Sequence, residues 1–224
     1  MFESLQLSDI PKRQCGIIRK PTSTSPVIWM MEENGVKTVV KDFSLNGFLF
    51  RNTIGRFLVW RESKAYRRLR GLKGIPALYR TLGGLALIFE AIPGKSIESV
   101  EVVKNLSESF FEELSILVKR VHERGMAHCD LKRAPNIILG EDGKPYIVDW
   151  AGSISRQEFR FFPLNRIYEK FIQDDLNALI KIRLKHCPER VSPEEKNRYI
   201  LRSKTEKIIR ALKDWVKDNL KKVA

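Results

Sequence analysis

Three residues with oxygen-bearing side chains lie close together in the middle of the sequence, and their types suit metal binding. Asp130 and Asn136 lie in the polar segment 128–139, and Asp149 directly follows the apolar run 146–148. Carboxylate and amide oxygens are ligands that Mg²⁺ prefers, and a further carboxylate can orient a hydroxyl group toward a phosphate. The spacing therefore predicts a site that holds a divalent cation and a hydroxyl acceptor over a nucleotide.

The elements on both sides of these residues must hold them in place. Residues 107–124 have the periodicity of an amphipathic helix, which ends at a glycine. Residues 137–148 have the pattern of two short strands with a turn between them. Asp130 and Asn136 are therefore predicted on a loop, and Asp149 at the end of the second strand.

Elsewhere, strands are predicted mainly in the first third of the chain and helices mainly after it. Asn34-Gly35 lies between two apolar or β-branched runs and favours a hairpin turn, because both residues tolerate positive φ. The expected strands are 27–31, 36–41 and 85–89, and the expected helices are 57–72, 107–124, 164–185 and 193–220. Strands first and helices later predict an α+β fold of two lobes, joined near residues 90–93.

Around these residues the chain resembles the eukaryotic-type protein kinase superfamily. The segment from His128 to Asn136 resembles the catalytic-loop pattern H-R-D-L-x-x-x-N, and Asp149-Trp150-Ala151 stands where D-F-G is expected. Upstream, Lys41 resembles the lysine of the V-A-I-K strand, and Glu62 resembles its partner on the following helix. These marks occur in the order of the family and cover most of the chain.

The end of the chain is shorter than in ordinary serine/threonine kinases and has no A-P-E signature. In this it resembles RIO kinases and the bacterial lipopolysaccharide (Kdo or heptose) kinases. The resemblance implies a two-lobed protein-kinase-like α+β fold, with a small β-rich lobe over residues 1–91 and a shortened helical lobe over residues 92–224.

The resemblance also implies ATP and Mg²⁺ as cofactors and a role for each matching residue. It makes Asp130 and Lys132 catalytic, Asn136 and Asp149 metal ligands, and Lys41, Glu62, Ser23, Thr24, Glu90 and Ile92 nucleotide-binding residues. Asp175, in the predicted helix 164–185, resembles the buried aspartate that braces the catalytic loop.

The catalytic loop departs from the family pattern in two places. Asn136 lies six residues after Asp130 instead of five, so residues 133–135 are expected to bulge outward. Cys129 replaces the arginine that pairs with an activation-loop phosphate in regulated kinases, which predicts independence from that phosphorylation. His128 is interpreted as a structural loop residue and not as a base.

The expected phosphate-binding loop contains no glycine. Residues 20–26 read Lys-Pro-Thr-Ser-Thr-Ser-Pro in place of G-x-G-x-x-G. Hydroxyl groups of residues 22–25 can donate hydrogen bonds to phosphates, and RIO kinases resemble this chain in having a serine-bearing loop here. An ordinary polar turn explains the same residues equally well.

The charge of the chain is strongly positive and unevenly distributed. The 224 residues include 41 Lys or Arg and 27 Asp or Glu, for a net charge of +14. Residues 51–80 contain nine basic residues against one acid, and residues 151–224 contain eighteen against ten. Solvated helix faces account for such runs, but the basic helix 56–73 and the amphipathic segment 203–224 also suit an anionic membrane surface or RNA.

Cysteine usage and hydropathy exclude several classes of protein. Three widely spaced cysteines, Cys15, Cys129 and Cys187, do not form a disulfide framework or a C-x-x-C zinc site. Residues 1–20 contain no secretory leader pattern, and no apolar run reaches membrane-spanning length. A cytoplasmic protein is expected.

Three functions are consistent with this pattern. The first is an ATP- and Mg²⁺-dependent phosphotransferase acting on a hydroxyl, of the RIO-type serine/threonine kinase class, because Lys132 completes a D-L-K sequence. The second is a kinase of lipopolysaccharide core sugars, peripheral to the inner membrane. The third is a pseudokinase or nucleotide-gated binding module. The partners expected are ATP and a hydroxyl-bearing acceptor, either a protein or a glycolipid sugar.

Overall fold

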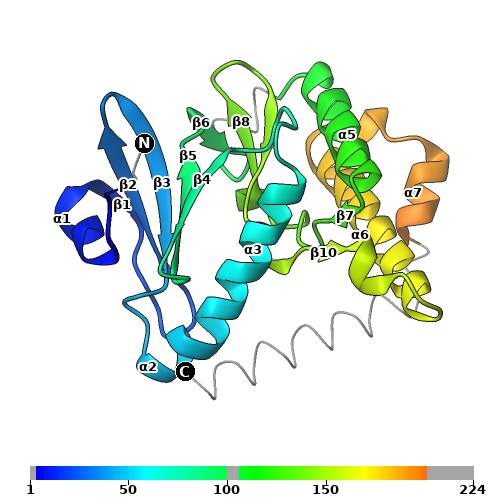
Figure 1. Ribbon diagram of the computed structural model, residues 1–224. Coiled ribbons are helices and arrows are strands. Elements are labelled where there is room, and N and C mark those ends of the chain that lie inside the picture. The colour runs from blue at the N-terminus through cyan, green and yellow to red at the C-terminus, as the bar shows by residue number, and fades with distance from the viewer. Residues whose placement is uncertain (1–3, 100–105, 201–224) are drawn as a thin grey trace. The chain divides into compact units, whose positions relative to one another are not determined.

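The computed structural model describes residues 4–99 and 106–200, which fall into two compact units. The first unit contains residues 4–70 and 76–91, and the second contains residues 71–75, 92–99 and 106–200. Figure 1 shows the strands of the first unit early in the chain and the long helices of the second unit later. This is the α+β order of elements that the sequence predicts.

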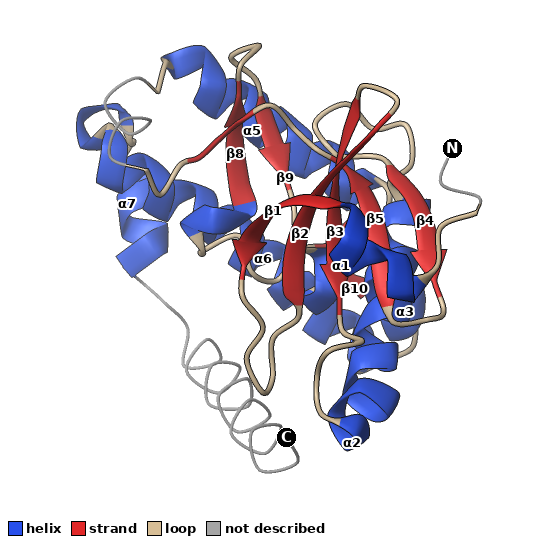
Figure 2. Cartoon of the chain, turned by 90° about the vertical axis from the view of Figure 1, so that its left-hand side faces the viewer, coloured by secondary structure: helices blue, strands red, loops and turns tan. Residues whose placement is uncertain are grey.

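The first unit is built on an antiparallel sheet of five strands among the described residues. Its strands are β1 (Gln14–Arg19), β2 (Val27–Glu33), β3 (Val36–Asp42), β4 (Leu78–Leu82) and β5 (Ala86–Glu90), in the order β1-β2-β3-β5-β4 (Figure 2). Asn34 and Gly35 have φ of 52° and 77°, as a two-residue hairpin turn requires, so the predicted β2–β3 hairpin is confirmed. The core of the sheet is a buried cluster that includes Trp29, Val40 and Ile88.

Among the described residues, the α-helices beside this sheet are α1 (Ile10–Arg13), α2 (Phe48–Phe50) and α3 (Arg56–Arg68). Helix α3 confirms the helix predicted over 57–72, although it ends before Gly71, whose φ is 78°. Its buried face contains Val59, Glu62, Ser63, Ala65 and Tyr66, whereas Phe57 and Trp60 are each 51% exposed. The face toward the sheet is therefore the one that carries Glu62.

The second unit contains three helices and two small sheets in its described part. The helices are α5 (Glu108–Glu123), α6 (Leu164–His186) and α7 (Pro193–Ile200). One sheet has the order β6 (Gly94–Ser96), β8 (Ile137–Gly140), β9 (Pro145–Ile147), and the other pairs β7 (Met126–Ala127) with β10 (Ile154–Ser155). Ser107 directly precedes α5, and its hydroxyl accepts a hydrogen bond from the amide of Phe110 and so caps the first turn.

The short segment 71–75 belongs to the second unit although α3 and β4 on either side belong to the first. The carbonyl of Gly74 accepts a hydrogen bond of 2.9 Å from the amide of Ile147. Gly74 has a φ of +92°, and a Cβ there would lie 2.6 Å from a methyl carbon of Leu117. A glycine is therefore required for this segment to lie against β9 and α5.

Helix α7 covers the first residues of the helix predicted over 193–220. The remainder, with the amphipathic segment 203–224, lies outside the described residues. Among the residues that are described, no helix combines the length and hydropathy needed to cross a membrane.

Candidate active site

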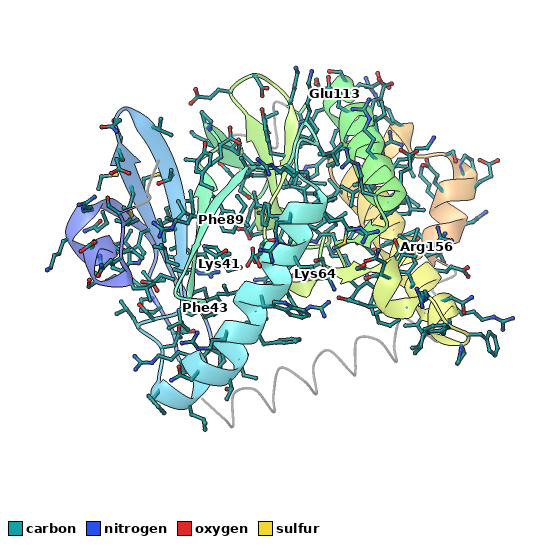
Figure 3. The ribbon with its side chains drawn as sticks, viewed as in Figure 1. Lys41, Phe43, Lys64, Phe89, Glu113 and Arg156 are labelled. Carbon is teal, nitrogen blue, oxygen red and sulfur yellow. The ribbon has the colours of Figure 1, made fainter. Side chains whose placement is uncertain are left out.

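A buried ion pair joins the sheet of the first unit to its long helix. The ammonium of Lys41 on β3 donates to a carboxylate oxygen of Glu62 on α3 over 2.7 Å. The two side chains are only 9% and 1% exposed, and Figure 3 shows Lys41 between the strand and the helix. The predicted contact is confirmed, and it fixes a charged lysine at a defined position of the sheet.

The glycine-free loop at residues 20–26, termed here the phosphate loop, is a tight hairpin end. Thr22 and Ser25 exchange two backbone hydrogen bonds, with Ser23-Thr24 as the turn. The side-chain amide of Asn46 donates to the carbonyls of Thr22 at 2.8 Å, Ser25 at 3.1 Å and Ser23 at 3.5 Å. Because these carbonyls bind one buried donor, the amides of the turn are the groups that remain for an anion.

The end of β5 contains Glu90, which the resemblance, like Ile92 just after it, assigns to nucleotide binding. The carboxylate of Glu90 accepts a hydrogen bond of 2.9 Å from the amide of Ala77, and the Glu90 amide donates back to the Ala77 carbonyl at 2.9 Å. The Glu90 side chain therefore fixes the start of β4. The amide of Ile92 has no backbone partner in the part of the chain that the structure describes.

In the second unit, Asp175 on α6 braces the loop that follows β7. Its carboxylate accepts hydrogen bonds from the amides of His128 at 2.7 Å and Cys129 at 2.9 Å, and lies 3.1 Å from Nε2 of His122. Asp175 is 1% exposed. The bracing role predicted for this residue is confirmed, and hydrogen bonds to an ionised acceptor are among the stronger ones in proteins.

His128 is a structural residue of this loop, as predicted. Its Nδ1 accepts a hydrogen bond of 3.3 Å from the amide of Asp130, so Nε2 carries the proton and donates to the carbonyl of Val148 at 3.0 Å. The ring packs edge-on against the buried indole of Trp150, with 4.5 Å between centroids. Both nitrogens of the imidazole are thus hydrogen-bonded within the protein, and the ring is packed against Trp150.

The extra residue between Asp130 and Asn136 is absorbed by a single turn of 3-10 helix over Ala134–Asn136. The amide of Arg133 donates to the carbonyl of Asp130 at 3.3 Å, and the amide of Asn136 donates to the carbonyl of Arg133 at 3.0 Å. The side-chain Nδ2 of Asn136 also donates to the Asp130 carbonyl, at 3.0 Å. The predicted outward bulge therefore takes the form of a compact turn, with Asn136 fixed to Asp130.

The β8–β9 hairpin brings Asn136 and Asp149 to the same end of a pair of strands. Ile137 pairs with Ile147, and the amide of Val148 donates to the carbonyl of Asn136 at 2.9 Å. Asp149 has φ of 63° and ψ of 69°, a left-handed conformation in which Asp and Asn are enriched. The Asn136 amide nitrogen is engaged by Asp130, which leaves Oδ1 as its ligand atom, so these residues fit the oxygen donors that Mg²⁺ prefers.

Lys132 forms an ion pair with Asp174, the residue before the bracing aspartate. Its ammonium donates to a carboxylate oxygen of Asp174, and the two side chains are 25% and 9% exposed. A guanidinium nitrogen of Arg133 lies 3.7 Å from a carboxylate oxygen of Asp130. Two basic side chains of the loop are thus paired with two carboxylates, one on the loop and one on α6.

Comparison with known proteins identifies the family. The family model of the RIO domain matches residues 50–194, more than half of the chain. This chain belongs to the RIO domain family. The RIO domain match contains the braced catalytic loop and Glu62, and the phosphate loop and Lys41 precede it. The predicted two-lobed kinase-like fold and the resemblance to RIO kinases are confirmed.

The chain is also similar to two curated kinases. It is 25% identical over 172 residues to the 3-deoxy-D-manno-octulosonic acid kinase of Xylella fastidiosa strain 9a5c, and 24% identical over 172 residues to that of strain M12. Each match covers 69% of this chain, and the chain spans 66% of the length of each relative, just under two thirds. The predicted resemblance to Kdo kinases is confirmed.

Three residues of the candidate site have structural roles that the sequence did not indicate. Asn46 holds the phosphate loop, Asp174 pairs with Lys132, and His122 contacts Asp175. Asn46 stands before a glycine in a turn-like sequence, which indicates only a turn. Asp174 is adjacent to Asp175, and only this pair of neighbouring aspartates in the sequence indicated that a second carboxylate could reach the catalytic loop.

Proposed function

We propose that this RIO domain protein is an ATP- and Mg²⁺-dependent kinase that transfers the γ-phosphoryl group to a hydroxyl acceptor. The observation that carries the proposal is the braced loop of the second unit, which fixes Asn136 to Asp130 and places Asn136 and Asp149 at one end of a hairpin. The kinase names of the curated relatives support the same reaction class.

In the proposed reaction each residue of the chain has one task. Mg²⁺, when bound, neutralises charge on the phosphates. Asn136 and Asp149 would hold it, and Lys41, positioned by its ion pair with Glu62, would contact the α- and β-phosphates. Asp130 accepts the proton of the acceptor hydroxyl while the bond from the γ-phosphorus to the bridging oxygen breaks and the new phosphorus–oxygen bond forms.

Lys132 is assigned the role of neutralising the negative charge that develops on the transferred phosphoryl group. A lysine two residues after the catalytic aspartate can neutralise that charge as the phosphoryl group moves. Its pairing with Asp174 holds the ammonium in position before substrate arrives. Asp174 thus acts on the reaction through Lys132.

For the acceptor we propose a hydroxyl of 3-deoxy-D-manno-octulosonic acid on a lipopolysaccharide core glycolipid. The names of the curated relatives support this choice, and a cytoplasmic protein peripheral to the inner membrane would meet such an acceptor. A serine or threonine of a protein is the second candidate, supported by the D-L-K sequence at Asp130–Lys132.

The test is transfer of labelled γ-phosphate from Mg-ATP to this glycolipid and, separately, to protein, including the chain itself. Asp130→Asn is expected to lower the transfer rate at least about a hundredfold, because the proton acceptor is lost. Asp142→Asn, in the exposed β8–β9 turn, is the matched control and should retain the wild-type rate.

Each outcome of this assay separates the candidates. Transfer to protein alone would replace the sugar acceptor by the second candidate. Equal rates for wild type and Asp130→Asn would contradict the kinase assignment. A Mg-ATP-dependent rise in melting temperature without transfer to any acceptor would favour a nucleotide-gated binding module.

A further inference from the structure

The segment that leads into α6 exposes large apolar side chains that the fold does not use. Residues 160–167, termed here the docking segment, follow the 3-10 turn Arg156–Phe159 and include the first turn of α6. Phe161 is 65% exposed, Phe162 72%, Leu164 41% and Ile167 38%. Four such side chains within eight residues form a concentrated apolar surface, which in a globular domain marks an interaction site.

Positive charge is interleaved with these side chains. The guanidinium of Arg160 lies 4.7 Å from the ring centroid of Phe161, and that of Arg166 lies 5.3 Å from the ring centroid of Phe162. The sequence 160–167 contains no acidic residue. Arginine over aromatic rings keeps cationic and apolar groups on one surface.

The residues next to the docking segment pack in the same hydrophobic cluster as a residue of the catalytic loop. Ala127, Cys129, Ile154 and Tyr168 form this buried cluster, and Phe159, Phe171 and Ile172 pack against it. Tyr168 directly follows the docking segment, and Cys129 directly precedes Asp130. The exposed segment and the loop that carries the proton acceptor are therefore fixed to one core within the second unit.

We propose that the docking segment binds the surface of an anionic phospholipid bilayer. Phe161, Phe162, Leu164 and Ile167 enter the interfacial layer, where aromatic and aliphatic side chains leave water. Arg160 and Arg166 contact lipid phosphates, whose negative charge complements the segment. The aliphatic members favour a lipid surface over single-stranded nucleic acid, since bases stack on aromatic rings and gain little from Leu164 or Ile167.

The proposal deepens the proposed function, because a lipid-bound acceptor is carried by such a surface. It does not depend on turnover, since docking is measured without nucleotide. Failure of the docking test would leave the transfer assay and the Mg-ATP melting shift intact, and failure of those assays would leave vesicle binding intact. The two proposals therefore fail separately.

The first experiment is co-sedimentation of the full chain with vesicles of phosphatidylcholine alone or of phosphatidylcholine with one quarter phosphatidylglycerol, at 0.15 M salt. Wild type is expected to sediment with the anionic vesicles. Phe161→Ser with Phe162→Ser should weaken that binding at least about tenfold, because two aromatic side chains no longer leave water. Arg160→Gln with Arg166→Gln should remove the preference for anionic vesicles.

The controls are exposed residues of the same unit. Ile116→Ser on α5 removes an apolar side chain that is 50% exposed, and Lys119→Gln with Lys181→Gln removes two exposed charges. Both control proteins should bind as wild type does. Equal loss in the controls and in the docking-segment variants would attribute binding to overall charge and overturn the proposal.

The second experiment measures insertion without removing the aromatic group. The Phe162→Trp variant should show a blue-shifted emission and quenching by brominated lipids beyond the wild-type signal, because an indole also prefers the interface. Wild type that stays in solution with anionic vesicles, or emission of the Phe162→Trp variant that these vesicles leave unchanged, would overturn the proposal. So would binding of single-stranded RNA that depends on Phe161 and Phe162 while vesicle binding does not.

Discussion

The phosphate loop and the catalytic loop are each held by one buried polar side chain, but the two side chains have opposite hydrogen-bonding polarity. Asn46 donates from its amide nitrogen to three carbonyls around Ser23. Asp175 accepts from the amides of His128 and Cys129. In one loop the carbonyls are engaged by the protein, and in the other the amides are.

This difference teaches how each loop acquires its preference for a ligand. A loop whose carbonyls are engaged has amide donors left for an anion such as phosphate. A loop whose amides are engaged by a carboxylate presents oxygen atoms instead, and here Asn136, together with Asp149 after β9, is assigned to the cation. We infer that a bracing residue of this polarity would allow a loop without glycine to present amides to a phosphate.

The largest expected effect follows from removing the brace of the catalytic loop. Asp175→Ala leaves two buried amides without an acceptor and should lower the free energy of unfolding by about 3 kcal/mol. Asp175→Asn, which retains one acceptor oxygen, should lose less. Urea unfolding monitored by tryptophan fluorescence measures both, and an unchanged midpoint for Asp175→Ala would show that the brace is not what holds the loop.

Reversing the polarity of the other brace is expected to have the next largest effect. In Asn46→Asp the donor that faces the carbonyls of Thr22 and Ser25 becomes an acceptor, while Oδ1 of Asn46 already has no hydrogen-bond partner among the described residues. The free energy of unfolding should fall by about 2 kcal/mol, and more than in Asn46→Ala.

The same two variants test the function of the phosphate loop. Affinity for Mg-ATP, measured by calorimetry, should fall in both, because the turn at Ser23-Thr24 is no longer fixed. If Asn46→Asp is as stable as Asn46→Ala and binds nucleotide equally well, the comparison of polarities is wrong for this loop.

A smaller effect on stability, with a separate effect on turnover, is expected at Lys132. Lys132 is 25% exposed but its partner Asp174 only 9%, so Lys132→Met should lower the free energy of unfolding by about 1 kcal/mol. The transfer rate should fall about a hundredfold, because the charge that stabilises the moving phosphoryl group is gone. Lys144→Met, in the exposed β8–β9 turn, is the control; a large loss of stability without a loss of rate would make Lys132 a structural residue.

The smallest effect comes from His186, which lies outside both loops. Burial and, secondarily, the charge of Lys185 lower the pKa of His186 below its ordinary value of 6.5. His186 therefore binds a proton more readily in the unfolded chain than in the folded protein. The stability that is present above pH 6.5 is lost as the pH falls from 6.5 through the lowered pKa of the folded state. His186→Gln should reduce this acid-side loss in urea unfolding from pH 7.5 to 5.0; an unchanged pH profile would assign it to other groups.

The sequence predicted the parts of the site whose residues stand at family spacing. Lys41 and Glu62 are paired, Asp175 braces the loop, and His128 is structural, as expected. Asn46 could not be predicted, because its bonds run to backbone carbonyls 21 to 24 residues away and no periodic pattern marks a side chain that binds backbone. The compact turn before Asn136 depends on local backbone hydrogen bonds that are equally hidden.

Helix α3 shows that apolar side chains alone do not identify a buried face. Phe57 and Trp60 are among its largest apolar residues, and they are half exposed. Glu62 must be inside to meet Lys41, so Val59 and Tyr66, three and four residues away on the same face, are buried with it. One buried ion pair thus determined the rotation of the helix.

The brace at Asp175 also determines how the catalytic loop exchanges hydrogen with solvent. The amides of His128 and Cys129 are bound to a carboxylate of α6, so they become accessible only when that helix separates from the loop. Their protection in deuterium exchange should match that of the α6 interior, whereas the turn amides at Ser23-Thr24 should exchange within the dead time. The loop assigned to chemistry should therefore open together with α6.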